Sequence, residues 1–291
     1  MHAYKLLSLI AAILLVTVIC AVPATVLAAG MDETTMFRYN AQRTGDYSPV
    51  AGSSTPNGQL KWSYVTKSQV LSSPAVANGV VYIGSFDHNV YALNSTTGEK
   101  IWNYTTADDV TSSPAVASGI VYVASDDRDV YALNSTTGEK IWNYTTGDDV
   151  GTSPAIANGM VYVGNGTGGN VYALNATTGT KIWSYTTGVL SSSPAIANGV
   201  IYVGSMGIRG GNVSALDATT GKMLWSFEIG SFPSSPAIAN GVVYVGSFMD
   251  GRVYAIGNQP QSQLPAARVR LNHLVSVGII SYVRRNGVHT L

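Results

Sequence analysis

Tryptophan recurs along this chain at a nearly constant interval. Successive tryptophans of the 291-residue sequence are 40, 40, 41 and 42 residues apart. The triplet Ser-Pro-Ala keeps the same period. Two independent markers with one period indicate units that fold alike, and a period near forty with several short strands in each unit is typical of β-propeller blades. The tryptophans are Trp62, Trp102, Trp142, Trp183 and Trp225.

Apolar runs and turn residues place the strands within one unit. We expect strands at residues 73–77, 80–85, 89–93 and 100–105, with Asn78-Gly79 as a two-residue hairpin turn. Runs such as VVYIG are apolar at consecutive positions, which suits strands that are covered on both faces. The sequence of residues 90–106 is repeated without change at residues 130–146, so adjacent units must have the same structure.

Counting the strands predicts an all-β fold, a β-propeller of about five four-stranded blades. Residues 234–257 contain only three strands and lack a fourth-strand tryptophan. Residues 58–65 (GQLKWSYV) match that missing strand, so we expect the last blade to be closed by an N-terminal strand, which would hide its edge. The alternative is that the chain is part of a longer, seven- or eight-bladed propeller. The four complete units are residues 72–106, 112–146, 152–187 and 192–228.

Composition excludes several classes of protein. The chain has 16 basic and 16 acidic residues, so a polybasic nucleic-acid binder is excluded. Its single cysteine, Cys20, lies in the apolar N-terminal stretch. The body of the protein therefore has no internal disulfide, cysteine nucleophile or thiolate metal site.

The ends of the chain differ from the repeated body. Residues 1–28 have the basic start, uncharged run and small residues of an export signal, and an uncleaved membrane anchor is the alternative. We expect an extracytoplasmic protein, secreted or at the cell surface. A leader follows at residues 29–57, and the propeller is predicted to span residues 58–258. Residues 259–291 form a basic tail with four arginines and no acid, whose structure the sequence does not indicate.

An eleven-residue stretch carries a family resemblance. Residues 92–102, ALNSTTGEKIW, recur with small changes from residues 132, 173 and 215, and they resemble the tryptophan-docking motif of pyrroloquinoline quinone (PQQ) repeat propellers. Asp217 keeps the aspartate of that motif, and asparagine replaces it in the other copies. Residues 36–45, MFRYNAQRTG, resemble the leader of exported PQQ-repeat proteins. The five tryptophans are accordingly interpreted as packing between blades, because each buried ring contributes a large apolar area.

Strand direction alternates within a blade, so the loops after the second and fourth strands should share one face. Residues 31–257 hold 16 acids and 11 bases, a net charge of −5, and most of the loop acids come from the first three units. These aspartates are either solvated loop residues or a surface for a basic peptide, a sugar or a calcium ion. His88 is alone in its loop, and we expect it to be solvated. The candidate face comprises Asp87, Asp108, Asp109, Asp126, Asp127, Asp129, Asp148 and Asp149.

Seven asparagines begin glycosylation sequons. Asn94, Asn134 and Asn175 stand in the docking motif, where holding the turn is an equally good explanation. Asn103 and Asn143 lie on the predicted outermost strand and are the better candidates for a glycan.

Three functional classes follow from these observations. The first is a non-catalytic interaction scaffold that binds an unknown protein, peptide or carbohydrate at the cell surface through its loop face. The resemblance implies the other two, an envelope or outer-membrane assembly factor and a PQQ-dependent dehydrogenase. The dehydrogenase is disfavoured because such enzymes have a vicinal disulfide and a calcium site that cannot be identified here. We therefore expect a monomeric protein that is not an enzyme, with no catalytic residue, no metal site that can be named and no PQQ; calcium is the cofactor left open.

Overall fold

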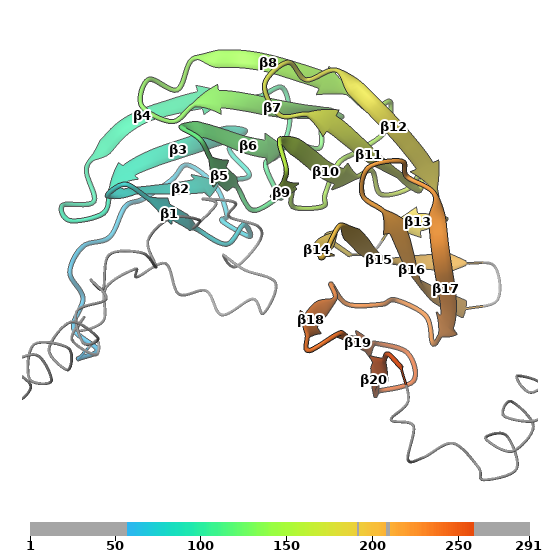
Figure 1. The fold of residues 1–291 in the computed structure, drawn as a ribbon. Coiled ribbons are helices and arrows are strands. Elements are labelled where there is room, and N and C mark those ends of the chain that lie inside the picture. Colours follow the sequence, from blue (N-terminus) through green and yellow to red (C-terminus); the bar gives the residue numbers. More distant parts are fainter. Residues whose placement is uncertain (1–56, 191, 208–209, 259–291) are drawn as a thin grey trace, which may run out of the picture. The chain divides into compact units, whose positions relative to one another are not determined.

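The computed structural model describes residues 57–258, apart from residues 191, 208 and 209. All of these belong to one compact unit, Thr34–Leu291. Every strand in the described part lies in one of five antiparallel sheets, and the sheets follow the order of the chain (Figure 1). No helix in the described part is long and apolar enough to cross a membrane. The predicted signal (1–28), the basic tail (259–291) and the leader (29–57) except residue 57 lie outside the described residues.

The first three sheets each contain four strands paired in chain order. The first sheet is formed by β1 (Ala75–Ala77), β2 (Val80–Gly84), β3 (Asn89–Asn94) and β4 (Lys100–Thr105). The second is formed by β5 (Ala115–Ala117), β6 (Ile120–Ala124), β7 (Asp129–Asn134) and β8 (Lys140–Thr145). The third is formed by β9 (Ala155–Ala157), β10 (Met160–Gly164), β11 (Asn170–Asn175) and β12 (Lys181–Thr186).

The last two sheets depart from this pattern. The fourth has an added short strand, β13, which pairs with β15 beside β14. The fifth has only three strands. The fourth sheet is formed by β13 (Val189–Leu190), β14 (Ala195–Ala197), β15 (Val200–Gly207), β16 (Gly210–Asp217) and β17 (Met223–Ile229). The fifth is formed by β18 (Ala237–Ala239), β19 (Val242–Ser247) and β20 (Arg252–Ile256).

The predicted hairpin turn explains how the two inner strands of each sheet meet. Asn78 and Gly79 have φ angles of 49° and 76°, as a type I′ turn requires at both central positions. Ala75 consequently lies opposite Tyr82 in the β1–β2 ladder. The strand positions expected from the sequence are confirmed to within two residues in this sheet.

The hydrophobic core lies between sheets and not within any one of them. Val90 and Ala92 of the first sheet pack in one cluster with Val121 and Leu133 of the second. Equivalent clusters join the second sheet to the third, the third to the fourth and the fourth to the fifth. The innermost strands contact one another in the order β1, β5, β9, β14 and β18. Because central strands are covered on both faces, their consecutive apolar residues are all buried.

A shared backbone carbonyl joins each of the first three sheets to the next one. The indole Nε1 of Trp142 and the hydroxyl of Tyr122 both donate to the carbonyl oxygen of Ala176, at 2.9 and 3.1 Å. A carbonyl oxygen has two lone pairs, so both donors are satisfied. The same pair recurs at two other junctions: Trp102 and Tyr82 donate to Ser135, and Trp183 and Tyr162 donate to Ala218.

The N-terminal segment and the last sheet do not pair with each other in the described structure. Residues 58–65 form no strand, and the sheet of β18–β20 has three strands. Trp62 instead donates from Nε1 to the carbonyl oxygen of Ser95 in the first sheet, at 3.0 Å. The five sheets are those of a five-bladed propeller, and closure of the last one by residues 58–65 stays a prediction.

Candidate binding face

Backbone hydrogen bonds bring the loops after the second and fourth strands of successive sheets together. The amide of Asp126, after β6, donates to the carbonyl of Asp109, after β4, at 2.9 Å. The amide of Gly166, after β10, donates in the same way to the carbonyl of Asp149, after β8, at 2.9 Å. The alternation of strand direction predicted this grouping, and these contacts show it for the first three sheets.

Two of the eight candidate aspartates stabilise their own loops. The hydroxyl of Tyr91 and the amide of Lys67 donate to Asp87 Oδ2, at 2.6 and 2.8 Å. Tyr131 donates to Asp127 Oδ2 at 2.7 Å in the next unit. Burial alone would raise the pKa of Asp87, but the hydrogen bonds, with that from Tyr91 foremost, hold it below its usual value. These carboxylates have structural partners, which makes them poor candidates for contacting a ligand.

A third aspartate is also engaged. Asp129 accepts hydrogen bonds from the side chains of Asn143 and Thr145 on the neighbouring strand β8. Asn89 takes its place in the first sheet and binds Asn103 and Thr105. Asp129 therefore ties the third strand of its sheet to the fourth.

Four of the five remaining aspartates form a cluster of negative charge around Asp126. Burial raises the pKa of Asp126, although the hydrogen bond from Thr111 Oγ1 at 3.0 Å opposes the rise. Further negative charges raise it more, and they belong to Asp149, Asp108 and Asp109. We call these four carboxylates, Asp108, Asp109, Asp126 and Asp149, the acidic cluster. The fold therefore holds Asp126 close to three other negative charges, which is unfavourable unless a cation offsets them.

Asp148 is a neighbour of the acidic cluster with a different environment. Its Oδ2 accepts from Thr167 Oγ1 at 2.6 Å, and its Oδ1 accepts from the amide of Asp149 at 2.9 Å. These hydrogen bonds, with that from Thr167 foremost, lower the pKa of Asp148. The carboxylate therefore stays charged, with both oxygens occupied by donors.

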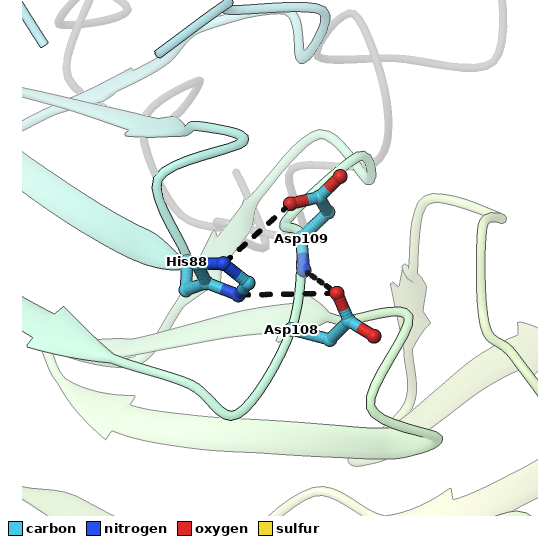
Figure 2. Close-up of side chains that lie close together, drawn as sticks. All are labelled: His88, Asp108 and Asp109. Atoms are coloured by element: carbon cyan, nitrogen blue, oxygen red, sulfur yellow. Dashed lines mark hydrogen bonds and ion pairs between the residues drawn. The ribbon is translucent and has the colours of Figure 1, made fainter. Parts of the chain in front are cut away.

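His88 is alone in its own loop and its side chain is 44% exposed, but it lies beside two members of the acidic cluster that come from the following loop. Its Nδ1 is 3.8 Å from Asp108 Oδ1, and its Nε2 is 4.0 Å from Asp109 Oδ1 (Figure 2). The Nδ1 atom is buried and has no hydrogen-bond partner among the described residues. Both ring nitrogens are thus directed at carboxylates at a distance that is long for a hydrogen bond.

Arg128 occupies the position of His88 in the second unit. Its Nε is 3.8 Å from Asp149 Oδ1, so it pairs with the following loop as His88 does. The third unit has Gly169 at this position, with a φ of 65° close to the 65° of His88 and the 78° of Arg128. The turn requires a left-handed conformation here, and two of the three units use it to place a nitrogenous side chain against the next loop's aspartates.

The three side chains of Figure 2 also form a group whose ligand atoms could hold a metal ion. One ligand atom from each of His88, Asp108 and Asp109 lies within 4.8 Å of the others. Calcium takes six to eight oxygen ligands, and this set supplies two carboxylates and a nitrogen. The equivalent contact of Arg128 with Asp149 indicates that a charge pair is the repeated feature. We therefore assign no metal to it.

The candidate glycosylation sites separate by burial. Asn103 and Asn143 are exposed on β4 and β8, as expected for the outermost strands. Asn94 Oδ1 instead accepts the amides of Thr96 and Thr97, at 2.8 and 3.0 Å, and so holds the docking turn. Asn134, Asn175 and Asp217 do the same in their units. Asn165 is 1% exposed.

Comparison with known proteins identifies the family. A family model described as the outer membrane protein assembly factor BamB, built on PQQ-like repeats, matches residues 25–113 and 87–270. The chain belongs to this PQQ-repeat family. The comparison with curated proteins gives no significant match.

Several solved structures share the fold at low sequence identity. BamB from Moraxella catarrhalis is 18% identical with a TM-score of 0.50, and the match covers 70% of this chain and 78% of that one. A quinohemoprotein alcohol dehydrogenase from Pseudomonas putida HK5 is 23% identical with a TM-score of 0.61, over 79% of this chain and 49% of that one. A quinohemoprotein alcohol dehydrogenase from Comamonas testosteroni is 20% identical with a TM-score of 0.54, over 66% of this chain and 43% of that one. The PQQ-repeat chain thus spans about half the length of either dehydrogenase, and these similarities show the fold alone.

Proposed function

We propose that this PQQ-repeat propeller is a non-catalytic extracytoplasmic scaffold whose acidic cluster binds a basic segment of another protein. The observation that carries the proposal is that contacts between successive loops gather the acidic cluster on one face. Burial and the surrounding carboxylates raise the pKa of Asp126 there. A group of like charges that the fold keeps together is a common property of functional sites, because a ligand of opposite charge relieves the repulsion. Extracytoplasmic location rests on the predicted signal at residues 1–28.

The side chains available support binding in preference to chemistry. His88 is the only histidine among the described residues, and its neighbours are carboxylates. Asp108 and Asp149 have side chains that are 56% and 65% exposed, so a lysine or arginine of a partner can reach them. Long-range attraction to such a surface increases the rate of association and weakens with salt.

The acidic cluster can be tested with a matched pair of variants. We would measure binding of a fluorescent octalysine peptide by anisotropy at low and at physiological salt. Asp108→Asn with Asp149→Asn should weaken binding several-fold. Glu99→Gln with Glu139→Gln removes the same charge from the docking turns between the third and fourth strands, and it should leave binding nearly unchanged. Equal losses in both variants would show that only net charge matters, and no loss in either would refute the proposal.

A second candidate function is assembly of outer membrane proteins, which the description of the matching family model favours. Deleting the gene in its native host should then lower the amount of folded outer membrane β-barrel protein, measured by heat-modifiable gel mobility. A scaffold with another role would leave the folded fraction unchanged.

Absence of PQQ-dependent catalysis is part of the proposal. Absorbance of the protein purified from its host, before and after addition of PQQ and calcium, is the direct measurement. A bound quinone chromophore with alcohol-dependent dye reduction would overturn the assignment.

A further inference from the structure

No strand among the described residues pairs with the outer edge of the last sheet. In each of the other four sheets the strand that corresponds to β20 is covered by an outermost strand, which is β4, β8, β12 or β17. In the last sheet no such strand lies beside β20 in the described part. Val253 of β20 is 80% exposed. Its counterparts in the other sheets are each 0% exposed, and they are Val90, Val130, Val171 and Val213. A row of free backbone donors and acceptors with an apolar side chain on it is a template for strand addition.

Residues 58–65 match an outermost strand in sequence but belong to no sheet in the described structure. A Cβ built on Gly98 would lie 2.6 Å from the ring of Trp62. A Cβ built on Gly138 would lie 2.7 Å from the ring of Trp102, so the two contacts are equivalent. The rings of Tyr64 and Tyr91 are 5.5 Å apart at 57°. The corresponding rings at the next two junctions are 5.5 Å apart at 55° and 5.8 Å apart at 57°. The segment thus occupies the place of the fourth strand of a sheet that would precede the first one.

Each of the two elements is held where it is by its neighbours. Trp62 is hydrogen-bonded to Ser95 of the first sheet, while β20 is joined to the fourth sheet through the contact of Tyr254 with Phe227, at 6.4 Å. Leu60 and Val65 remain 82% and 87% exposed. Neither element covers the other in the described structure, although the sequence of one supplies what the other lacks.

We propose that copies of this chain associate head to tail, with residues 58–65 of one copy adding as the fourth strand beside β20 of the next. The repeat gives the register. Ala92 lies opposite Trp102 and Asn89 opposite Thr105 in the first sheet, so Ala255 should lie opposite Trp62. The same offset places Arg252 opposite Val65.

Such an interface joins two different surfaces, so it generates a ring if the rotation closes and an open row of subunits if it does not. It would bury Val253, Leu60 and Val65, three apolar side chains that are at least 80% exposed in the single chain. The monomer expected from the sequence would form only if residues 58–65 paired with β20 of their own chain. Association between copies and closure within one chain use the same contacts, so the experiment must separate them.

Disulfide trapping between two single-cysteine variants separates these arrangements. In a Cys20→Ser background, Val65→Cys and Arg252→Cys are made separately, and the two proteins are mixed under mild oxidation. Cα atoms of directly opposed residues in an antiparallel pair lie within the range that a disulfide spans. The mixture should give a covalent dimer on a non-reducing gel. Val65→Cys mixed with Glu139→Cys, which lies away from this edge, should give only background.

The double variant Val65→Cys with Arg252→Cys supplies the contrary outcome. Head-to-tail association predicts a ladder of covalent multimers. A cross-linked monomer from the double variant, with no dimer from the mixture, would show internal closure and overturn the proposal, as would the absence of any cross-link.

A charged residue at the edge gives a second test that does not depend on disulfide geometry. Val253→Lys should abolish concentration-dependent association in light scattering, because a charge on the edge strand blocks pairing. The substitution should leave the folded monomer intact because Val253 is already exposed. Unchanged association in this variant would contradict the proposal.

Discussion

The indole of Trp102 lies against the backbone of Gly138, so closely that a Cβ on that glycine would be 2.7 Å from the ring. Gly138 also has a φ of 74°, in the left-handed region that glycine adopts most readily. The glycine of the docking turn thus has two separate reasons for its identity. One is local conformation, and the other is contact with the preceding sheet.

A pair of glycine substitutions should separate these two effects. Gly159 has a φ of 71°, and apart from its neighbours in the chain no atom lies within 4 Å of the position that an added methyl group would take. Gly159→Ala should therefore lower the free energy of unfolding only by the cost of the left-handed conformation, about 1–2 kcal/mol. Gly138→Ala adds displacement of the indole and should cost at least about 1 kcal/mol more. Urea unfolding of both variants measures the difference. Equal losses would mean that the Trp102 contact contributes nothing.

Buried tyrosines should make the fold sensitive to alkali. Burial raises the pKa of Tyr122 to about 12, from a usual value of 10, because the neutral hydroxyl is favoured in the core. The folded state therefore binds more protons than the unfolded state between about pH 10 and 12, so stability falls as pH rises through that window. Tyr122→Phe should reduce this slope and cost about 1 kcal/mol at pH 7, since Ala176 keeps the Trp142 donor. Thermal unfolding at pH 7 and above pH 10 tests both statements.

Neutralising Asp126 should stabilise the protein near neutral pH. Its pKa is raised in the folded state, so folding favours the protonated form, and stability is lost as pH rises from the unfolded pKa through the folded one. Asp126→Asn removes this penalty and keeps an oxygen to accept from Thr111 Oγ1. The melting temperature should rise at pH 7, and the gain should disappear in acid below both pKa values. A lower melting temperature at pH 7 would indicate that the carboxylate has a favourable partner.

The tryptophans should differ in their contribution to stability. Trp102 is 8% exposed and shares its acceptor with Tyr82, so Trp102→Ala should cost about 3–5 kcal/mol. Trp62 is only partly buried and no sheet in the described part precedes it, so Trp62→Ala should cost less. Chemical denaturation of dilute protein makes the comparison. If the Trp62 variant loses as much as the Trp102 variant, the indole of Trp62 is more enclosed in solution than this structure indicates.

Strand positions could be predicted from the sequence because the repeat tests each assignment several times. Asn78-Gly79 predicts a turn by local conformation alone, and the same turn recurs in each unit. The docking role of Trp142 was also predictable, but its acceptor, the carbonyl of Ala176, was not. Which backbone atom faces an indole depends on how two sheets pack, and sequence spacing does not report that.

The candidate face was predicted only in outline. The sequence places Asp87 and Asp127 on the candidate face, and the structure adds that each accepts hydrogen bonds from a tyrosine hydroxyl and a backbone amide. A signal was present, because an aspartate precedes a tyrosine by four residues at Asp87, Asp127 and Asp250. The approach of His88 to Asp108 and Asp109 had no such signal. These residues are about twenty positions apart and meet only through the packing of one loop against the next.

The junctions between sheets also bear on how such a chain changes in evolution. Each buried indole is received by a main-chain oxygen, of Ser135, Ala176 or Ala218, so the side chain at the receiving position is immaterial. Residues 90–106 are already identical to residues 130–146. Recombination between those two stretches of the gene would add or remove one whole unit, and a main-chain oxygen would again receive the indole at the new junction. Blade number can therefore alter in single steps, without a compensating mutation elsewhere.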